Sequence, residues 1–334
     1  GRGQQGYLGA RRRGCVMLSR VGDSTYWMGR YIERAENNAR LLDVNVQMLL
    51  DFESRRNETE RQFWGPILST LEDTELFHEL HSEFTSAAVL DYVTFEPRNP
   101  NSISSCINYA RENARAVRDQ ISSEMWEQIN ALWLYFRDGT AARDFRANSH
   151  EFYDKVTYAS QLFQGVTDAT MTHSEAWRFV QAGKFIERAD STSRILDLKY
   201  HILLPSGEQV GGNVDTSQWT SVLRSCSGME ACLKIRKGDV TPWGVAEFLI
   251  CHDEFPRSIR FCVDRLDEVL HDISSTEEGR FRNEPERLSG LLRSQLDYAT
   301  IDSIFAHGLH EYLDGIQEKL IELDIAFHRT YCAY

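Results

Sequence analysis

The sequence lacks the features that mark membrane, secreted and nucleic-acid-binding proteins. Its 334 residues contain no apolar run of the roughly 20 residues that a membrane-spanning helix requires. The seven cysteines form no CxxC pair, which disfavours structural zinc, and their odd number fits a reducing compartment better than a disulfide framework. The formal net charge is −13, and a negative charge of this size repels nucleic acid and anionic membrane. We therefore expect a cytoplasmic protein that binds neither nucleic acid nor membrane.

Residues 1–16 differ from the rest of the chain because they carry four arginines and no acidic residue. No apolar segment follows these arginines, as one would in a signal peptide. We interpret residues 1–16 as a disordered leader or an expression remnant, with Met17 as the natural start.

Proline is also scarce. Six of the seven stand where we expect helices to begin or end: Pro66, Pro97, Pro100, Pro205, Pro242 and Pro285. Between these points apolar residues recur every three or four positions, along positions 25 to 49 and again from Ile103 to Ile121. This period is typical of amphipathic helices packed in a bundle, and the alternation of strands is missing. The sequence predicts an all-α fold.

The sequence also repeats itself. Glu33-Arg34-Ala35 recurs 154 positions later as Glu187-Arg188-Ala189. "NPNSISSC" (99–106) corresponds to "FPRSIRFC" (255–262), and "HEFYD" (150–154) to "HEYLD" (310–314). The offset grows only slowly along the chain, as small loop insertions would produce. We infer a tandem duplication of a multi-helix unit, with a first helical repeat at 17–170 and a second at 171–334 that pack together.

A charged stripe accompanies the apolar stripe of the first long helix and recurs in the second copy. Its members are Arg30, Glu33, Arg34, Glu36 and Arg40, then Glu187, Arg188, Asp190 and Arg194. The simplest interpretation is a solvated face stabilised by its own i,i+4 pairs, Glu36–Arg40 and Asp190–Arg194. The alternative is a binding or catalytic surface, because this pattern is kept in both copies while much of the surface differs.

A second charged group lies in "YARENARAVRDQ" (109–120). Arg111, Arg115 and Arg118 follow at i, i+4 and i+7, which predicts a cationic ridge along one helix of the first copy only. Aligned guanidinium groups can hold a phosphate or carboxylate by bidentate hydrogen bonds. The alternative is pairing with Glu112 and Asp119 on the same helix.

No complete catalytic constellation is visible in the sequence. Glu33 and Glu187 are the candidate catalytic residues, because a duplication could bring two carboxylates together and split their pKa values. Glu75-x-x-His78 stands alone, whereas a di-iron bundle needs two such pairs, so we assign no metal. Neither a Walker phosphate loop nor a dinucleotide fingerprint occurs, and we assign no cofactor.

Three long motifs are similar to the bacterial alpha-E domain family: "MLSRVGDSTYWMGRYIERAENNARLLDVN" (17–45), "FEPRNPNSISSCINYARENARAVRDQISSEMWEQIN" (95–130) and "FPRSIRFC" (255–262). The resemblance covers 17–334 and implies an all-helical bacterial protein of the cytoplasm. It also implies genes beside, or fused to, a circularly permuted ATP-grasp ligase and near a transglutaminase-like protein. The motif residues carried over are Arg20, Arg30, Glu33, Arg34, Glu36, Arg40, Arg111, Glu112, Asn113, Arg115 and Arg118.

Three functional hypotheses follow. The first is a helical partner of an ATP-grasp amidoligase that presents a peptide or acyl-phosphate substrate in amide-bond synthesis or modification. The second is an enzyme in which the two glutamates work as a carboxylate pair and the arginine ridge holds an anionic or peptide substrate. The third is a metal-binding bundle.

Overall fold

The computed structural model describes residues 19–52, 60–71, 74–203, 213–238, 240–277 and 279–332. Every regular element in these residues is helical, so the expected all-α fold is confirmed. The expected leader, residues 1–16, lies outside them. Within the described ranges, none of the helices is both long and apolar enough to cross a membrane.

The helices follow one another in two series, each of which begins with its longest member. The first series is α1 (Ser19–Phe52), α2 (Glu60–Thr70), α3 (Thr74–Leu80), α4 (Ser86–Phe95), α5 (Ile103–Ala116), α6 (Ser123–Arg137), α7 (Thr140–Ala147) and α8 (Ser149–Thr170). The second is α9 (Glu175–Leu203), α10 (Asn213–Ser225), α11 (Met229–Ile235), α12 (Pro242–Cys251), α13 (Ile259–Ser274), α14 (Glu284–Asp297), α15 (Ile301–His307), α16 (Leu309–Phe327) and the π-helical turn η2 (His328–Cys332).

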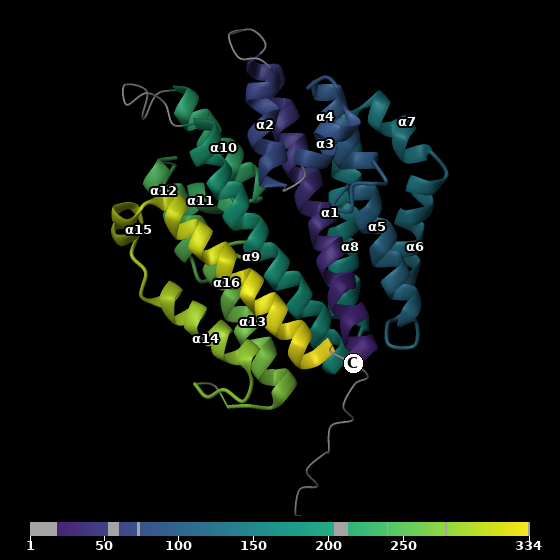
Figure 1. Ribbon diagram of the computed structural model, residues 1–334, viewed down its shortest axis with the longest axis vertical. Coiled ribbons are helices and arrows are strands. Elements are labelled where there is room, and N and C mark those ends of the chain that lie inside the picture. Colours follow the sequence, from purple (N-terminus) through teal and green to yellow (C-terminus); the bar gives the residue numbers. More distant parts are fainter. Residues whose placement is uncertain are drawn as a thin grey trace, which may run out of the picture.

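The two long helices, α1 and α9, form the centre of the molecule and pack against each other. α5 and α8 cover α1, while α13 and α16 cover α9. In Figure 1, α5, α6 and α7 lie to one side of this central pair, and α12, α14 and α15 lie to the other. The second helix of each series crosses over, because α2 packs on α9 and α10 packs on α1. The two series are therefore interlocked at the centre.

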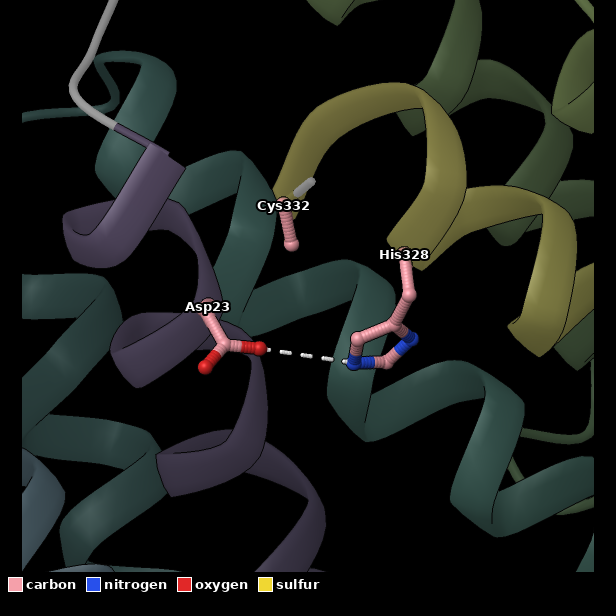
Figure 2. Close-up of side chains that lie close together, drawn as sticks. All are labelled: Asp23, His328 and Cys332. Carbon is pink, nitrogen blue, oxygen red and sulfur yellow. Dashed lines mark ion pairs between the residues drawn. The ribbon is translucent and has the colours of Figure 1, made fainter. Parts of the chain in front are cut away.

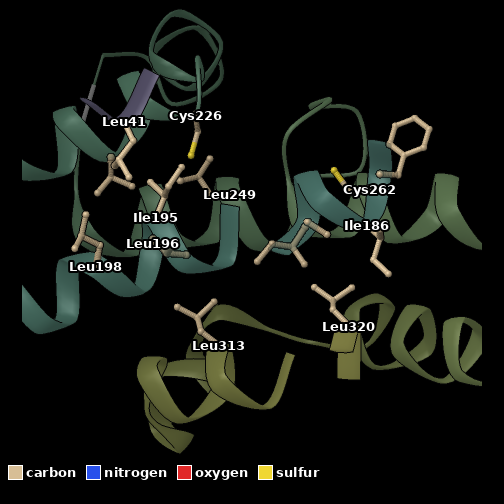
Figure 3. Close-up of a cluster of buried hydrophobic side chains, with 14 of the residues drawn as sticks. Leu41, Ile186, Ile195, Leu196, Leu198, Cys226, Leu249, Cys262, Leu313 and Leu320 are labelled. Carbon is tan, nitrogen blue, oxygen red and sulfur yellow. The ribbon is translucent and has the colours of Figure 1, made fainter. Parts of the chain in front are cut away.

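The apolar stripe predicted on the first long helix is buried, including Met28, Ile32 and Leu42. The second long helix, α9, also buries apolar side chains. Figure 3 shows Ile186 of α9 directed toward Leu320 of α16, and Ile195 of α9 beside Leu41 of α1 and Leu249 of α12. Each such side chain contributes roughly 1.5–3 kcal/mol when fully buried. The long helices are thus held by packing on several sides.

The helix predicted through Ile121 ends earlier than its apolar spacing indicated. α5 stops at Ala116, and residues 117–120 form a turn in which Val117 is still buried. The chain turns here because Ser122 caps the next helix, α6, by accepting a hydrogen bond from the Met125 amide at 3.1 Å. Val117 and Ile121 continue the apolar spacing of α5 because both are buried between α5 and α6, in one cluster with Ala114 and Met125.

Pro242 and Pro285 lie in the first turns of α12 and α14, which confirms the helix starts predicted at these two prolines. The expectation for Pro66 is wrong, since it lies inside α2. Proline removes a backbone donor there, but Trp64 and Ile67 on either side are fully buried. Tertiary packing therefore holds a turn that local propensity disfavours. Pro205 lies outside the described residues.

Candidate functional site

Two glutamate–arginine pairs cross between the central helices. Arg34 of α1 binds Glu187 of α9 through Nε–Oε1 at 2.6 Å and Nη2–Oε2 at 2.8 Å. Arg188 of α9 binds Glu33 of α1 in the same way, with both distances at 2.8 Å. Each pair is a bidentate, charge-assisted contact, the strongest geometry available to these side chains. Adjacent residues in each sequence motif thus bind the opposite helix rather than each other.

The charged stripe is buried or half-buried along its whole length, so the interpretation as a solvated face is wrong. Glu33 is 0% exposed, Glu36 1% and Glu187 4%. Periodicity placed these residues away from the apolar stripe, but α1 and α9 are surrounded by other helices on that side as well. Both predicted i,i+4 pairs are present. Glu36–Arg40 is joined to the crossed pairs through Arg257, and Asp190–Arg194 lies beside the Arg34–Glu187 pair.

Each central glutamate also binds a second arginine, which comes from a different element in each case. Arg30 of α1 donates to Glu187 at 2.8 Å and contacts Asp324 of α16 at 2.9 Å. The second arginine at Glu33 is Arg257, from the loop before α13. Its Nη1 binds Glu33 Oε1 at 2.9 Å, and its Nη2 binds Glu36 at 2.5 Å.

The arginines keep both central glutamates ionised. Burial alone would raise the pKa of Glu33, but Arg188 and Arg257 outweigh it and hold that pKa well below its ordinary value. The pKa of Glu187 is lowered in the same manner, with burial opposed by Arg34 and Arg30. A general acid needs a raised pKa, and a shared proton needs two carboxylates without their own cations. The arrangement therefore suits fixed positioning and binding better than proton transfer.

A pocket of about 200 Å³ adjoins the Arg34–Glu187 pair, between α1, α9 and α16. We call it the Asp190 pocket. Its polar lining consists of Arg30, Arg34, Asn37, Asn38, Thr70, Asn101, Glu187, Asp190, Ser191, Arg194 and Asp324. Burial raises the pKa of Asp190, even though Arg194 binds its Oδ2 at 2.8 Å.

A second pocket, of about 290 Å³, adjoins the Arg188–Glu33 pair. We call it the Arg257 pocket. Its lining consists of Glu36, Arg40, Gln161, Gln164, Arg188, Ser227, Phe255, Pro256 and Arg257. Nine of the residues singled out from the sequence, Arg30 to Arg40 and Glu187 to Arg194, therefore belong to one network with its two pockets.

The cationic ridge lies elsewhere, on the outer side of the first series, and lines neither pocket. Arg111 and Arg115 both bind Glu112, which confirms part of the pairing alternative. Asn113 donates to the Tyr109 carbonyl of its own helix at 2.9 Å.

The expectation of one continuous ridge on one helix is wrong in part, because Arg118 and Asp119 follow the end of α5. Arg111 is packed with its guanidinium carbon 4.0 Å from the ring centre of Trp133, and Arg118 lies over Trp126 at 5.6 Å. Arg115 extends outward, with a side chain that is 66% exposed.

Sequence reasoning missed several members of the network. Arg257 stands in "FPRS" where the first copy has Asn101 in "NPNS", and this difference was the available signal. Asp324 and Gln164 come from α16 and α8, and neither carries a local sequence signature. Gln164 donates to Glu33 at 2.7 Å, and Asp324 accepts from the hydroxyl of Tyr26 at 2.5 Å.

Among the residues that the structure describes, two groups of side chains have metal-ligand chemistry. Asp23, His328 and Cys332 bring their ligand atoms within 4.8 Å of one another (Figure 2). Burial would lower the pKa of His328, but Asp23 and Asp324 raise it to about 10, so the ring is a cation at neutral pH. A metal ion would have to displace this proton. The second group is Asp43, His150 and Asp154, where His150 bonds Asp43 at 2.8 Å and is more than half exposed.

Comparison with known proteins gives a family and three relatives. Residues 17–332 match the model of the Alpha-E family, described as a predicted alpha-helical domain with a conserved ER motif. An uncharacterized protein of Mycobacterium bovis and two of Mycobacterium tuberculosis strains are each 24% identical over 330 residues. These matches cover 94% of this chain but only 36% of each relative. No solved structure matches.

The Glu-Arg dipeptide stands at corresponding positions of the two central helices, at Glu33-Arg34 and Glu187-Arg188, and the crossed ion pairs give it a structural role there. With nearly the whole described chain inside the match, this protein belongs to the Alpha-E family.

Proposed function

We propose that this protein is a cytoplasmic helical partner of an ATP-grasp amidoligase, in a system that makes or modifies amide bonds and that also includes a transglutaminase-like protein. In this role it presents a peptide or acyl-phosphate substrate to the ligase. The observation that carries the proposal is the placement of the ER motif. Its four charged groups are locked in crossed ion pairs beside a pocket that keeps unsatisfied polar atoms. Such a site is preorganised to bind a polar ligand.

The depressed pKa values of Glu33 and Glu187 support binding over acid–base catalysis. The length of the relatives supports a component that works beside other domains, since the matched segment is about a third of each relative. The ligase itself is inferred from what the family resemblance implies for gene neighbours.

We also infer that the chain is a tandem duplication with repeats at 17–170 and 171–334. Paired contacts support it. Asn38 donates to the Asn101 carbonyl at 2.8 Å, and Thr192, in the place of Asn38, donates to the Arg257 carbonyl at 2.8 Å. His150 binds Asp43 as His310 binds Asp197, again at 2.8 Å in both copies. The first of these two pairs of contacts relates the Asp190 pocket, lined by Asn38 and Asn101, to the Arg257 pocket.

The experiment is co-purification of the tagged chain with the ATP-grasp ligase that the proposal expects to be encoded beside its gene. We expect the ligase to bind, and we expect Arg115→Glu with Arg118→Glu to abolish the complex, because both arginines are exposed. Arg111 is left in place because it is packed against Trp133. The control reverses two exposed arginines of the second series, Arg265→Glu with Arg280→Glu, and should leave the complex intact. Wild-type levels of ligase on the ridge variant would discard a docking role for the ridge. Absence of the ligase from the wild-type preparation would discard the partnership.

A further inference from the structure

We propose that the Asp190 pocket binds the guanidinium group of an arginine residue in a peptide. This inference deepens the proposed function, because it names the group by which the pocket would recognise a peptide substrate. It is argued from the two pockets beside the crossed ER pairs, one of which holds Arg257, an arginine from the loop before α13.

The Arg257 pocket shows how such a group is held. The guanidinium of Arg257 reaches Glu33 and Glu36, and it also donates to Asn37 Oδ1 at 2.7 Å. In the Asp190 pocket the corresponding chain position is Asn101, which follows a proline and precedes a helix-capping serine as Arg257 does. Asn101 has a shorter side chain without charge, and its Oδ1 accepts from Arg34 at 2.7 Å. Arg30 takes the place of Arg257 at the central glutamate of this pocket, but no guanidinium among the described residues reaches Asp190 in the way that Arg257 reaches Glu36.

The carboxylate that would receive this guanidinium is incompletely bonded. Glu36, in the Arg257 pocket, accepts from Arg40, Arg257 and Ser160. Asp190 takes the place of Glu36 in the second motif and is bound by Arg194 at Oδ2. Its Oδ1 is buried and has no hydrogen-bond partner within the described part of the chain. Buried polar atoms are nearly always bonded, so Asp190 Oδ1 points to a ligand donor.

A second buried atom restricts the ligand further. Asn37 is 4% exposed and lines the Asp190 pocket. Its Oδ1 is committed to Arg257, and this bond fixes the orientation of the amide because a reversed amide would direct its NH₂ group at a guanidinium. Asn37 Nδ2 has no partner among the residues described. The ligand must therefore bring an acceptor as well as a cationic donor, as the carbonyl and guanidinium of an arginine residue do.

The charge balance of the two pockets agrees with this assignment. Three arginines and three carboxylates line the Asp190 pocket: Arg30, Arg34, Arg194, Glu187, Asp190 and Asp324. In the Arg257 pocket, Arg40, Arg188 and Arg257 lie against Glu36 and the underlying Glu33, an excess of one cation. A bound guanidinium would give the Asp190 pocket this same excess. The planar fork of guanidinium also matches a carboxylate better than an ammonium does.

The test is calorimetric titration of the full chain with N-acetylarginine amide. We expect binding, with N-acetylcitrulline amide, which has the same shape without the charge, at least about tenfold weaker. Asp190→Asn should weaken binding of N-acetylarginine amide to a similar degree. Asp253→Asn, which changes an exposed side chain, should leave this binding unchanged. Equal binding of citrulline and arginine ligands, or tighter binding of inorganic phosphate that Asp190→Asn does not weaken, would overturn the assignment.

A second variant tests the internal comparison. Asn101→Arg supplies the guanidinium from the chain itself, so it should raise the melting temperature and abolish binding of the arginine ligand. Undiminished binding to folded Asn101→Arg would overturn the proposal. In the other pocket, Arg257→Ala removes the native guanidinium, and millimolar methylguanidinium should restore part of the lost melting temperature.

The pocket assignment and the ligase partnership fail separately. If the chain binds the arginine ligand but does not co-purify with the ligase, the ligase partnership is wrong and the pocket assignment stands. If the chain co-purifies with the ligase but does not bind the arginine ligand, the pocket assignment is wrong and the ligase partnership stands.

Discussion

Gly29 of α1 and Gly183 of α9 each face a backbone carbonyl of the opposite central helix. A Cβ on Gly29 would lie 2.4 Å from the Val180 oxygen, and a Cβ on Gly183 would lie 2.1 Å from the Tyr26 oxygen. Both distances are far shorter than ordinary contact, so only glycine permits the helices to cross this closely. Each glycine lies one turn before the glutamate of its motif, and the crossed ion pairs depend on this spacing.

We therefore expect Gly183→Ala to lower the free energy of unfolding by about 3 kcal/mol, the upper end for overpacked sites. The neighbouring atom is backbone and cannot move aside as a side chain could. Urea unfolding followed by circular dichroism measures the change. The matched control is Gly165→Ala in α8, where a Cβ meets no atom within 4 Å. It should stabilise the protein by about 1 kcal/mol, because alanine favours helix over glycine. Equal effects of the two substitutions would contradict the close crossing.

Glu33→Gln should destabilise the protein by about 3–5 kcal/mol, as expected when one partner of a buried ion pair is removed. The substitution leaves Arg188 buried without its carboxylate and removes one of the two carboxylates that Arg257 binds. Chemical denaturation measures the loss. Glu96→Gln is the control, because its partner Arg98 is 64% exposed and the pair should contribute less than about 1 kcal/mol. A loss as small as that of the control would show that the network is not energetically coupled.

Acid should weaken this network in a defined direction. The folded pKa values of Glu33 and Glu187 lie below those of an unfolded glutamate, so the stabilisation is complete above about pH 4.3 and is lost as the pH falls below it. Melting temperatures from pH 6 to pH 3 should therefore fall more steeply for the wild type than for Glu187→Gln. Parallel curves would contradict the ion-paired assignment of Glu187.

Arg111 and Arg115 should differ in their contribution to stability, although both belong to the ridge. Arg111 has a side chain that is 18% exposed, lies over Trp133 and bonds Asn130 at 3.0 Å. Arg111→Ala should cost about 1–2 kcal/mol through lost packing and cation–π contact. Arg115→Ala, at an exposed site, should stay within about 0.5 kcal/mol of the wild type. Thermal unfolding distinguishes the two, and equal effects would mean that Arg111 is not held by the indole rings.

The sequence was sufficient for the all-helical fold, and it drew attention to Glu33 and Glu187 without predicting their environment. Periodicity reports which residues share a face of one helix. It does not report how many neighbours surround that helix, and so the charged stripe looked compatible with solvent. The crossed pairs join residues about 154 positions apart on different helices, a relationship fixed only by the α1–α9 crossing.

Other misses have equally local causes. Arg257 was visible as a difference between "NPNS" and "FPRS", but its direction depends on a loop that periodicity does not describe. The end of α5 was missed because Val117 and Ile121 continue the apolar spacing of the helix. The Ser122 cap that interrupts it is a short-range signal outweighed by that pattern. Sequence patterns thus gave the candidate residues, and tertiary geometry supplied their partners.

His328 should make stability depend on pH at the alkaline end. Its folded pKa is raised to about 10 by Asp23 and Asp324 against the opposing effect of burial, while an unfolded histidine titrates near pH 6.5. The ion pairs therefore contribute fully below about pH 6.5, and their contribution declines as the pH rises toward 10. The difference in melting temperature between the wild type and His328→Gln should be largest at pH 6 and should shrink steadily up to pH 10. His307→Gln, at an exposed histidine, should follow the wild type throughout. A His328→Gln difference that stays constant from pH 6 to pH 10 would show that His328 is not a cation in the folded protein, and the group formed with Asp23 and Cys332 would then be open to a metal ion without loss of a proton.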